Sequence, residues 1–282
     1  EFRRVLFRSR FPMETQIIDF HTHIYPVALA RRAMEVVRRE GDPYDSLPIR
    51  ENLLRRMEEA DISLSVVQPV VSRPETQTDV NRFAREIVRT NLISFGGLHP
   101  DCPHVLEEIE KLKDLHMAGV KFHPPFQKVH LEDGKYREIW ERINHLGLPV
   151  LIHCGCAKVP SPYDLHPASA EEIVRHLPDV PVILAHMGGL SMDQTGEDRL
   201  YRMPENVYID TAMSAEFQDK DEFERIAGSF GPDRVIFGSD FPYGSQRAAI
   251  RLIEETGFSP WEKAAILGEN ARKILKDSIR KR

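Results

Sequence analysis

Three histidines and one aspartate stand at the ends of short apolar segments, where a folded chain could gather them around a metal ion. These residues are His21, His23, His153 and Asp240. Residues i and i+2 of a strand point to the same side, so His21 and His23 can reach one ion. Twelve histidines in 282 residues would give about half of one H-x-H motif by chance, so the position of the motif at a segment end is what supports the assignment. Three imidazoles and one carboxylate suit zinc, with manganese, iron or cobalt as alternatives.

This donor set predicts chemistry on a metal-bound water. Such a site leaves room at the ion for a water molecule, whose pKa can fall from about 15.7 to about 7. Asp240 could accept the proton of that water, so we predict that it acts as ligand and base together. His186 ends another apolar segment and is either a second acid–base group or a ligand of a second ion, and we expect one ion. The alternative is a set of structural histidines, hydrogen-bonded at the rim of the fold.

Lys121, His123 and Gln127 are the candidate substrate-binding residues. Lys121 precedes His123 by two positions, so both side chains should face the interior. A lone buried ammonium is costly, and three interpretations remain open: a clamp for a substrate anion, a metal-bridging carbamate, or a salt bridge to Asp19. Asp19 precedes His21 by two positions, so it either orients that ligand or forms a buried structural pair. Gln127 follows in the loop sequence PPFQ and is expected to line the pocket.

Eight apolar segments rich in valine and isoleucine alternate with amphipathic helical patterns. The apolar segments are 16–23, 62–70, 92–99, 118–123, 148–153, 180–186, 206–212 and 233–240, and the helical patterns include 26–40, 80–90, 103–116, 136–147 and 168–178. Mostly continuous apolar runs are typical of parallel strands covered on both sides. The alternation predicts an α/β fold, a (β/α)8 TIM barrel, whose strand carboxyl ends meet at one mouth. An open doubly wound sheet is the rival, but the chain has no glycine-rich phosphate loop to favour it.

Composition and charge restrict the class of protein. Hydrophobic residues make up 41% and charged residues 29% of the chain, as in a globular protein with a large core. The net charge of −6 provides no electrostatic footprint for nucleic acid or an anionic membrane, and no apolar run approaches the ~18–20 residues of a membrane helix. The three cysteines are too few, and odd in number, for a disulfide framework, so we expect a cytoplasmic protein.

Length and local composition predict one domain. A single α/β barrel takes about 250 residues, so residues 13–282 are expected to form one barrel domain. Residues 1–12 are arginine-rich and lack the apolar stretch of a signal peptide, so we interpret them as a non-native leader. Residues 41–50 and 155–167 are predicted to be long loops, and the second follows a strand on the face where barrel active sites lie.

Six motifs follow one another along the chain. They are DFHTHIYP (19–26), GVKFHPPFQ (119–127), GLPVLIHCG (147–155), PVILAHMGG (181–189), RVIFGSDFP (234–242) and ILGENARKIL (266–275). Their order resembles that of the amidohydrolase superfamily. From Thr15 to Leu275 the chain resembles the amidohydrolase-related family and, within it, the branch that contains aminocarboxymuconate-semialdehyde decarboxylase and its hydrolase relatives. The resemblance implies a distorted, metal-dependent TIM barrel.

The resemblance also implies roles for single residues. The metal-ligand positions of the family are matched by His21, His23, His153 and Asp240. His186 matches the sixth-strand histidine, which is an acid–base or substrate-polarising group in members with one metal and a second-metal ligand in members with two. Lys121 falls where some two-metal members carry a carboxylated lysine, although G-V-K-F-H-P is not the typical context for that group. Members of the superfamily often form dimers, which suggests a homodimer by analogy.

These observations lead to one leading hypothesis and two alternatives. The leading hypothesis is hydrolysis, in which a metal-activated water attacks a small ester, lactone or amide. In this hypothesis, Asp240 accepts the proton of the metal-bound water, and His186 stabilises the developing charge or protonates the leaving group. The first alternative is non-oxidative decarboxylation of an aromatic or unsaturated carboxylic acid that the metal anchors. The second is a barrel that only binds a metal or ligand as a sensor. Lys121 favours an anionic small-molecule substrate for either reaction.

Overall fold

The computed structural model describes residues 16–37, 47–157, 159–191 and 196–280. The predicted leader, residues 1–12, lies outside the described residues, as does most of the predicted loop 41–50. No helix in the described ranges is long and apolar enough to span a membrane.

Short parallel strands occupy every segment in which the sequence predicted a strand. They are β1 (Ile17–Thr22), β2 (Ile62–Val67), β3 (Leu92–Ser94), β4 (Gly96–Gly97), β5 (Val120–Phe122), β6 (Val150–Ile152), β7 (Val182–Leu184), β8 (Val207–Asp210) and β9 (Val235–Ile236). β3 and β4 are two parts of one predicted segment, interrupted only at Phe95. The strands pair in the order β1-β2-β3 and β4-β5-β6-β7-β8-β9. The barrel closes between its last and first strands. The N–H of Phe20 in β1 donates to the carbonyl of Phe237, directly after β9, at 2.9 Å.

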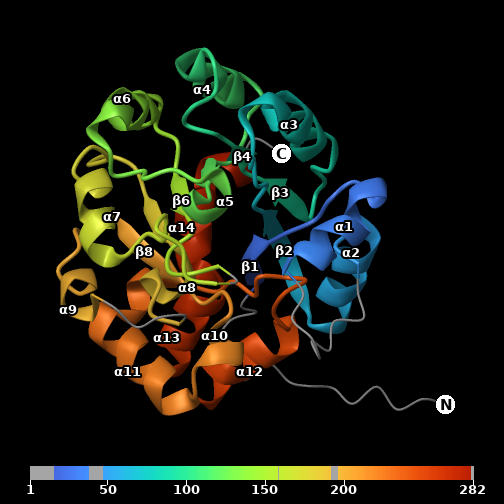
Figure 1. Cartoon of the computed structure of the whole chain (residues 1–282). Helices are drawn as coiled ribbons and strands as arrows, with labels where there is room; N and C mark the ends of the chain where they lie inside the picture. The colour runs from blue at the N-terminus through green and yellow to red at the C-terminus, as the bar shows by residue number, and fades with distance from the viewer. Residues whose placement is uncertain (1–15, 38–46, 158, 192–195, 281–282) are drawn as a thin grey trace.

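Helices follow the strands and form a layer around them (Figure 1). The longer helices are α1 (Val27–Val37), α2 (Arg50–Glu59), α3 (Gln77–Glu86), α4 (Val105–Asp114), α6 (Arg137–Leu146), α7 (Pro167–Val174), α11 (Lys220–Phe230), α12 (Gln246–Glu255) and α14 (Asn270–Arg280). The shorter ones are α5 (Pro124–Gln127), α8 (Ala185–Gly188), α9 (Glu197–Leu200), α10 (Ser214–Phe217) and α13 (Pro260–Ala264). The predicted helical patterns each contain a helix, and the predicted fold, a distorted (β/α)8 barrel, is confirmed.

Strand side chains alternate between two hydrophobic layers. In β6, Val150 and Ile152 pack between the strands and the surrounding helices, where they join residues such as Trp140 of α6. Leu151 points the other way and packs inside the barrel, as Ile183 of β7 does. Because both faces of most strand segments are buried, the strands are mostly apolar, which is why the sequence shows apolar runs in place of a regular apolar–polar alternation.

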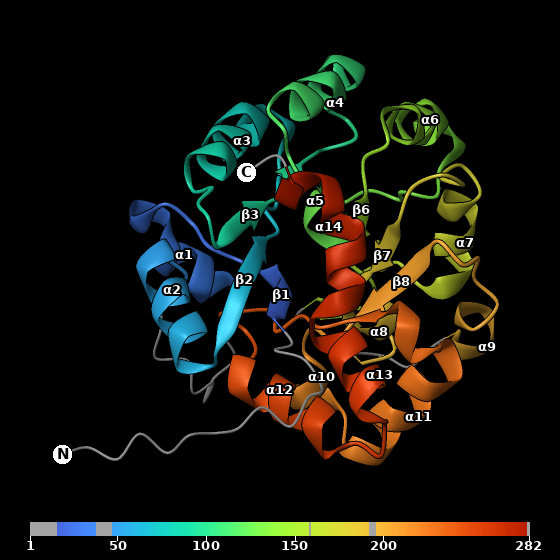
Figure 2. The ribbon, with the colours of Figure 1, turned by 180° about the vertical axis from the view of Figure 1, so that it is seen from behind.

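Helix α14 covers the amino-terminal end of the barrel (Figure 2). Ala271 and Leu275 belong to the hydrophobic cluster inside the barrel. The Asn270 side-chain amide donates to the carbonyls of Pro232 and Val235, at 2.9 and 2.8 Å, where β9 begins. The polar residues singled out in the sequence lie at the other end of the barrel, where the strands finish.

A bulge in β1 changes the direction of the side chains that precede the H-x-H motif. From Asp19 to Thr22, β1 advances three residues while the paired strand β2 advances two. Regular alternation would put Asp19 and His21 on one side, but the extra residue separates them. Asp19 bonds Gln246 of α12, whereas the His21 ring lies at the mouth of the barrel beside Lys121.

Candidate active site

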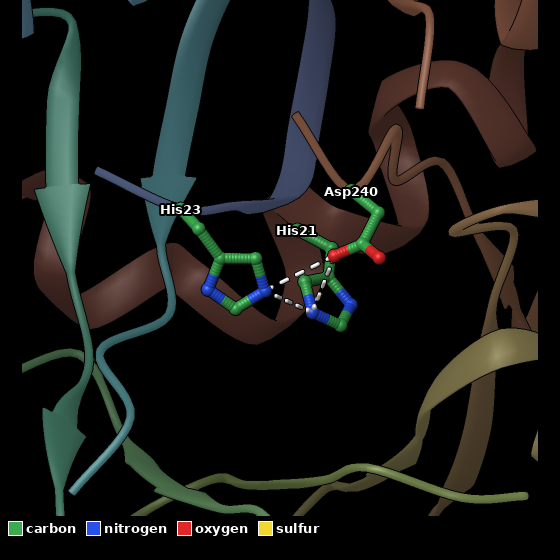
Figure 3. A group of neighbouring side chains, drawn as sticks. All are labelled: His21, His23 and Asp240. Carbon is green, nitrogen blue, oxygen red and sulfur yellow. Dashed lines mark hydrogen bonds and ion pairs between the residues drawn. The ribbon is translucent and has the colours of Figure 1, made fainter. Parts of the chain in front are cut away.

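Three ligand atoms from distant parts of the chain meet at the mouth of the barrel (Figure 3). His21 Nε2 lies 3.2 Å from His23 Nε2. Asp240 Oδ1 lies 3.0 Å from His23 Nε2 and 3.4 Å from His21 Nε2. All three residues are buried, and their ligand atoms lie within 4.8 Å of one another. The structure therefore brings together three of the four predicted metal ligands.

Hydrogen bonds of the two imidazoles determine which ring nitrogens have a free lone pair. His21 Nδ1 lies 2.7 Å from Asp210 Oδ2, and His23 Nδ1 lies 2.7 Å from the Gln68 carbonyl oxygen. A carboxylate and a carbonyl only accept hydrogen bonds, so we assign the proton of each neutral ring to Nδ1. Both Nε2 atoms then present lone pairs to each other and to the Asp240 carboxylate, an arrangement that a bound cation stabilises.

Asp240 reaches the histidines because the backbone turns back toward β1 after β9. The Asp240 backbone has a φ of 63°, in the left-handed region, and its N–H donates to the His21 carbonyl at 2.8 Å. Burial raises the pKa of the Asp240 carboxyl group, but the positive charge of His21 and His23, when these rings are protonated, outweighs burial and holds that pKa well below its usual value. With neutral rings, a bound cation would supply the positive charge that keeps the carboxylate ionised. Oδ1 is buried and accepts no hydrogen bond from the described residues, because the facing Nε2 atoms carry no proton. These properties fit a divalent cation.

His153 and His186 form a second imidazole pair, at the ends of the neighbouring strands β6 and β7. His186 Nδ1 lies 3.1 Å from the Ala212 carbonyl oxygen, so it carries a proton. His186 Nε2 lies 2.9 Å from His153 Nδ1 and, in the neutral pair, accepts a hydrogen bond from it. His153 Nε2 therefore keeps a lone pair, and it is buried without a partner among the described residues. His153 is outside the three-residue cluster, so its role as the fourth ligand stays a prediction.

Lys121 is a buried cation beside the cluster. Its relative exposure is 1%, and its Nζ lies 3.4 Å from His21 Nε2. Burial lowers the pKa of Lys121 to about 8, against the opposing effect of Asp210 and Asp240. Lys121 therefore faces the mouth of the barrel, as the spacing to His123 predicted.

Asp19 makes contacts that exclude the salt bridge to Lys121 that we had considered. It accepts hydrogen bonds from the Ser239 N–H at 2.9 Å, from Ser239 Oγ at 2.6 Å and from Gln246 Nε2 at 2.8 Å. These bonds use both carboxylate oxygens and tie β1 to the segment after β9. In the described part of the chain Asp19 bonds neither Lys121 nor the ring of His21, so it is a structural carboxylate. The bulge in β1 is the reason, because it turns Asp19 away from the mouth.

An aromatic stack stands next to Lys121. The rings of Phe126 and His123 are almost parallel with centroids 4.1 Å apart, and those of His123 and His153 are 4.0 Å apart. His123 Nδ1 is buried without a hydrogen-bond partner among the described residues. Burial, followed by the charge on Lys121, holds the pKa of His123 well below its usual value. A neutral imidazole with an unpaired nitrogen beside an ammonium suits an anionic ligand, and the substrate role of both residues stays a prediction.

Gln127 is engaged with the backbone. Its Oε1 accepts from the His123 N–H at 2.9 Å, and its Nε2 donates to the carbonyls of Val71 and Leu98 at 3.0 and 2.7 Å. These three bonds hold the backbone of His123 in place. A direct contact of Gln127 with substrate stays a prediction.

Two features of the site were missed in the sequence. Asp210, at the end of β8, is fully buried and bonds His21. A carboxylate at the end of an apolar segment is the same signal that marked Asp240, and it could have identified Asp210. Tyr25 and Tyr243 pair through their hydroxyl oxygens at 3.2 Å, with the Tyr243 ring 5.8 Å from that of His23. No sequence pattern links residues so far apart in the chain.

Fold and site together define a class of protein: a TIM barrel with a candidate metal centre at the carboxyl ends of its strands. A family model described as Amidohydrolase matches residues 18–276. The chain therefore belongs to the amidohydrolase family, and the resemblance read from the six motifs is confirmed. The protein is an enzyme of this family.

Similar proteins include one curated relative and many solved structures. The 6-methylsalicylic acid decarboxylase of Penicillium expansum is 25% identical over 293 residues, which cover 83% of this chain and 87% of that protein. The dihydroxybenzoic acid decarboxylase of Polaromonas sp. JS666, solved with bound manganese and 2-nitroresorcinol, has a TM-score of 0.73 and 18% identity, over 94% of this chain and 98% of that chain. An uncharacterized TIM-barrel protein of Bordetella bronchiseptica has a TM-score of 0.76 and 19% identity, over 93% of this chain and 99% of that chain.

The comparisons correct the leading hypothesis from the sequence. We expected hydrolysis of an ester, lactone or amide, but several of the similar proteins, including the curated relative, are decarboxylases by name. The hydrolase prediction is therefore wrong. The error has a physical reason: the residues that hold and activate a metal-bound group can serve either reaction, so the motifs that identified the site did not distinguish the two.

Proposed function

We propose that this protein is a metal-dependent, non-oxidative decarboxylase of a small aromatic carboxylic acid. The relatives described above act on such acids by name. The structural observation that carries the proposal is the buried ammonium of Lys121, 3.4 Å from the candidate metal ligand His21. It supplies a positive charge for a carboxylate beside the place where the ion would bind.

His21 Nε2, His23 Nε2 and Asp240 Oδ1 are the atoms that would hold the ion, with His153 Nε2 as the proposed fourth. When bound, a divalent cation supplies positive charge that attracts the substrate's oxygen atoms and stabilises negative charge that develops on them. The nitrogen-rich donor set supports zinc, and the manganese in the Polaromonas structure supports manganese as the rival. We propose one ion, because the described residues offer a single cluster of three ligands.

Substrate binding is assigned to Lys121, His123 and Gln127. The Lys121 ammonium pairs with the substrate carboxylate, and a hydrogen bond to a charged group contributes about 1.5–3 kcal/mol. His123 offers its unpaired Nδ1 on the same side of the site. Gln127 contributes by holding the His123 backbone at 2.9 Å.

The reaction breaks the bond between the carboxyl carbon and the ring, and it forms a carbon–hydrogen bond at the same ring atom. One proton is consumed for each carbon dioxide released. The proton comes from solvent, and we assign its transfer to the ring carbon to His186 together with Asp240. The His186 ring lies 5.3 Å from the ring of His21 and hydrogen-bonds His153 at 2.9 Å, so it is next to the candidate metal ligands.

A substrate panel tests the proposal. Purified protein loaded with zinc or with manganese is incubated with benzoic acids that carry one or two hydroxyl groups, and carbon dioxide and the decarboxylated phenol are measured together. We expect equal amounts of both products from at least one acid, and loss of activity in Asp240→Asn. Metal-loaded, folded protein that releases carbon dioxide from no acid in the panel would exclude the proposal.

Cellular location and assembly are two further proposals. The cytoplasmic location rests on the low, odd number of cysteines, which are Cys102, Cys154 and Cys156. The homodimer rests on analogy with the superfamily. Light scattering of the purified protein tests the second: a mass near the 32.4 kDa of one chain would exclude a stable dimer.

A further inference from the structure

Asp210 connects the two groups of histidines at the mouth of the barrel. It ends β8 and has a relative exposure of 0%. Its Oδ2 lies 2.7 Å from His21 Nδ1. Its Oδ1 accepts hydrogen bonds from the backbone N–H groups of His186 at 2.9 Å and Ala212 at 3.1 Å. One carboxylate therefore contacts the side chain of a candidate ligand and the backbone of the candidate acid–base residue.

The bond to His21 determines where the proton of that imidazole lies. A carboxylate oxygen has no proton to donate, so Nδ1 of the neutral ring must carry one, and Nε2 keeps its lone pair. Nε2 is the atom that faces His23 and Asp240. Asp210 thus selects the tautomer of His21 that can bind a metal.

The bonds to the backbone hold a conformation that is costly for a residue with a side chain. His186 has a φ of 58°, in the left-handed region, which residues other than glycine adopt only with backbone strain. Its N–H is fixed on Asp210 Oδ1, and its ring reaches the Ala212 carbonyl and His153. The same carboxylate therefore supports the His186–His153 pair.

We propose that Asp210 is a positioning residue that keeps His21 in its metal-binding tautomer while it anchors the backbone of His186. The inference rests on the metal-binding part of the proposed function and is independent of which acid is decarboxylated. Asp210 acts through the two histidines and need not touch substrate.

Asp210→Asn separates the two roles. The amide oxygen can replace Oδ1 and still accept from the N–H groups of His186 and Ala212. The NH₂ group then replaces Oδ2 and can only donate to His21 Nδ1, so that nitrogen must become the acceptor and its proton must move to Nε2. The variant keeps the size and the backbone bonds of the wild type, but the ligand lone pair of His21 is lost.

Asp19→Asn is the matched control. Asp19 has the same relative exposure of 0%, and its carboxylate also bonds backbone and side chains near the end of β1, but it contacts no imidazole ring in the described part of the chain. Ser239 Oγ can turn to accept from the new amide, and the side-chain amide of Gln246, whose Oε1 is unpaired, can flip to do the same. This variant removes the charge of a buried carboxylate without changing the tautomer of any histidine.

Two readouts besides activity test the proposal. In ¹⁵N-edited NMR of the metal-free wild type, we expect the His21 proton on Nδ1, and in metal-free Asp210→Asn we expect it on Nε2. By calorimetry with zinc or manganese, we expect the Kd to rise about 10–100-fold in Asp210→Asn, the range typical for loss of such a partner, and less than about threefold in Asp19→Asn.

Each outcome decides the proposal without reference to decarboxylation. A metal-free wild type with the His21 proton on Nε2 would overturn it, and this measurement needs no variant to fold. Wild-type metal affinity in a folded Asp210→Asn would overturn it as well. A protein that binds metal as expected but decarboxylates no acid would exclude the proposed reaction and leave the role of Asp210 supported.

Discussion

Gly238 lies against His21, and Gly238→Ala should disturb the metal centre through a single added methyl group. A Cβ atom at Gly238 would lie 2.8 Å from His21 Cβ and 3.4 Å from the His21 backbone nitrogen. Gly238 has no positive φ, so alanine is compatible with its backbone. The substitution therefore tests only the close approach between β1 and the segment after β9, behind the ligand His21.

The expected size of the effect follows from these distances. Ordinary carbon contacts begin at 3.4 Å, so Gly238→Ala must push the two atoms apart by about 0.6 Å, the difference between 3.4 and 2.8 Å. Metal–ligand distances tolerate only about 0.2 Å, so His21 Nε2 leaves its place relative to His23 and Asp240. We expect a metal Kd raised at least about tenfold and a loss of about 1–3 kcal/mol in the free energy of unfolding from overpacking.

Calorimetry with zinc and manganese, together with urea unfolding, measures both effects. Gly228→Ala in α11 is the control, because its added Cβ would meet its nearest neighbour, Phe258, at an ordinary 3.6 Å. A helix-interior alanine in place of glycine should keep or raise stability and leave metal affinity unchanged. Wild-type metal affinity in Gly238→Ala would refute the reasoning that the backbone behind His21 sets the position of its ring.

Three further substitutions test the site and the core. Asp240→Asn should lose bound metal in elemental analysis, whereas the exposed Asp233→Asn keeps it; equal metal content in both would contradict the role of Asp240 as ligand. Lys121→Met should raise the KM for an anionic substrate about tenfold or more, as expected for a lost charge-assisted bond, and unchanged kinetics would exclude the carboxylate clamp; Lys113→Met on the surface is the control. Ile183→Ala, inside the barrel at 0% exposure, should lower the free energy of unfolding measured in urea by about 2–5 kcal/mol. Val159→Ala, at 67% exposure, should change this free energy little.

Local patterns in the sequence were sufficient for the barrel and for the centre of the site. Strands buried on both faces must be apolar along their length, so the eight segments could be recognised without knowledge of their neighbours. The carboxyl ends of parallel strands meet at one mouth, so His21, His23 and Asp240 could be placed together from their positions alone. In the structure their ligand atoms lie 3.0–3.4 Å apart, and their role as metal ligands stays a prediction.

Contacts through space decided the rest. The sequence allowed Asp19 to orient His21, but the bulge in β1 turned it away. Asp210, which lies 189 residues after His21 in the chain, bonds the His21 ring instead. A bulge depends on the register between two strands, and a hydrogen bond between β1 and β8 depends on closure of the barrel, so neither has a local signature. The sequence by itself determined that His21, His23 and Asp240 stand at the mouth. Only the tertiary structure decided which side chains touch, and that Asp210 is among them, because side-chain direction and proton position are set by neighbours from other strands.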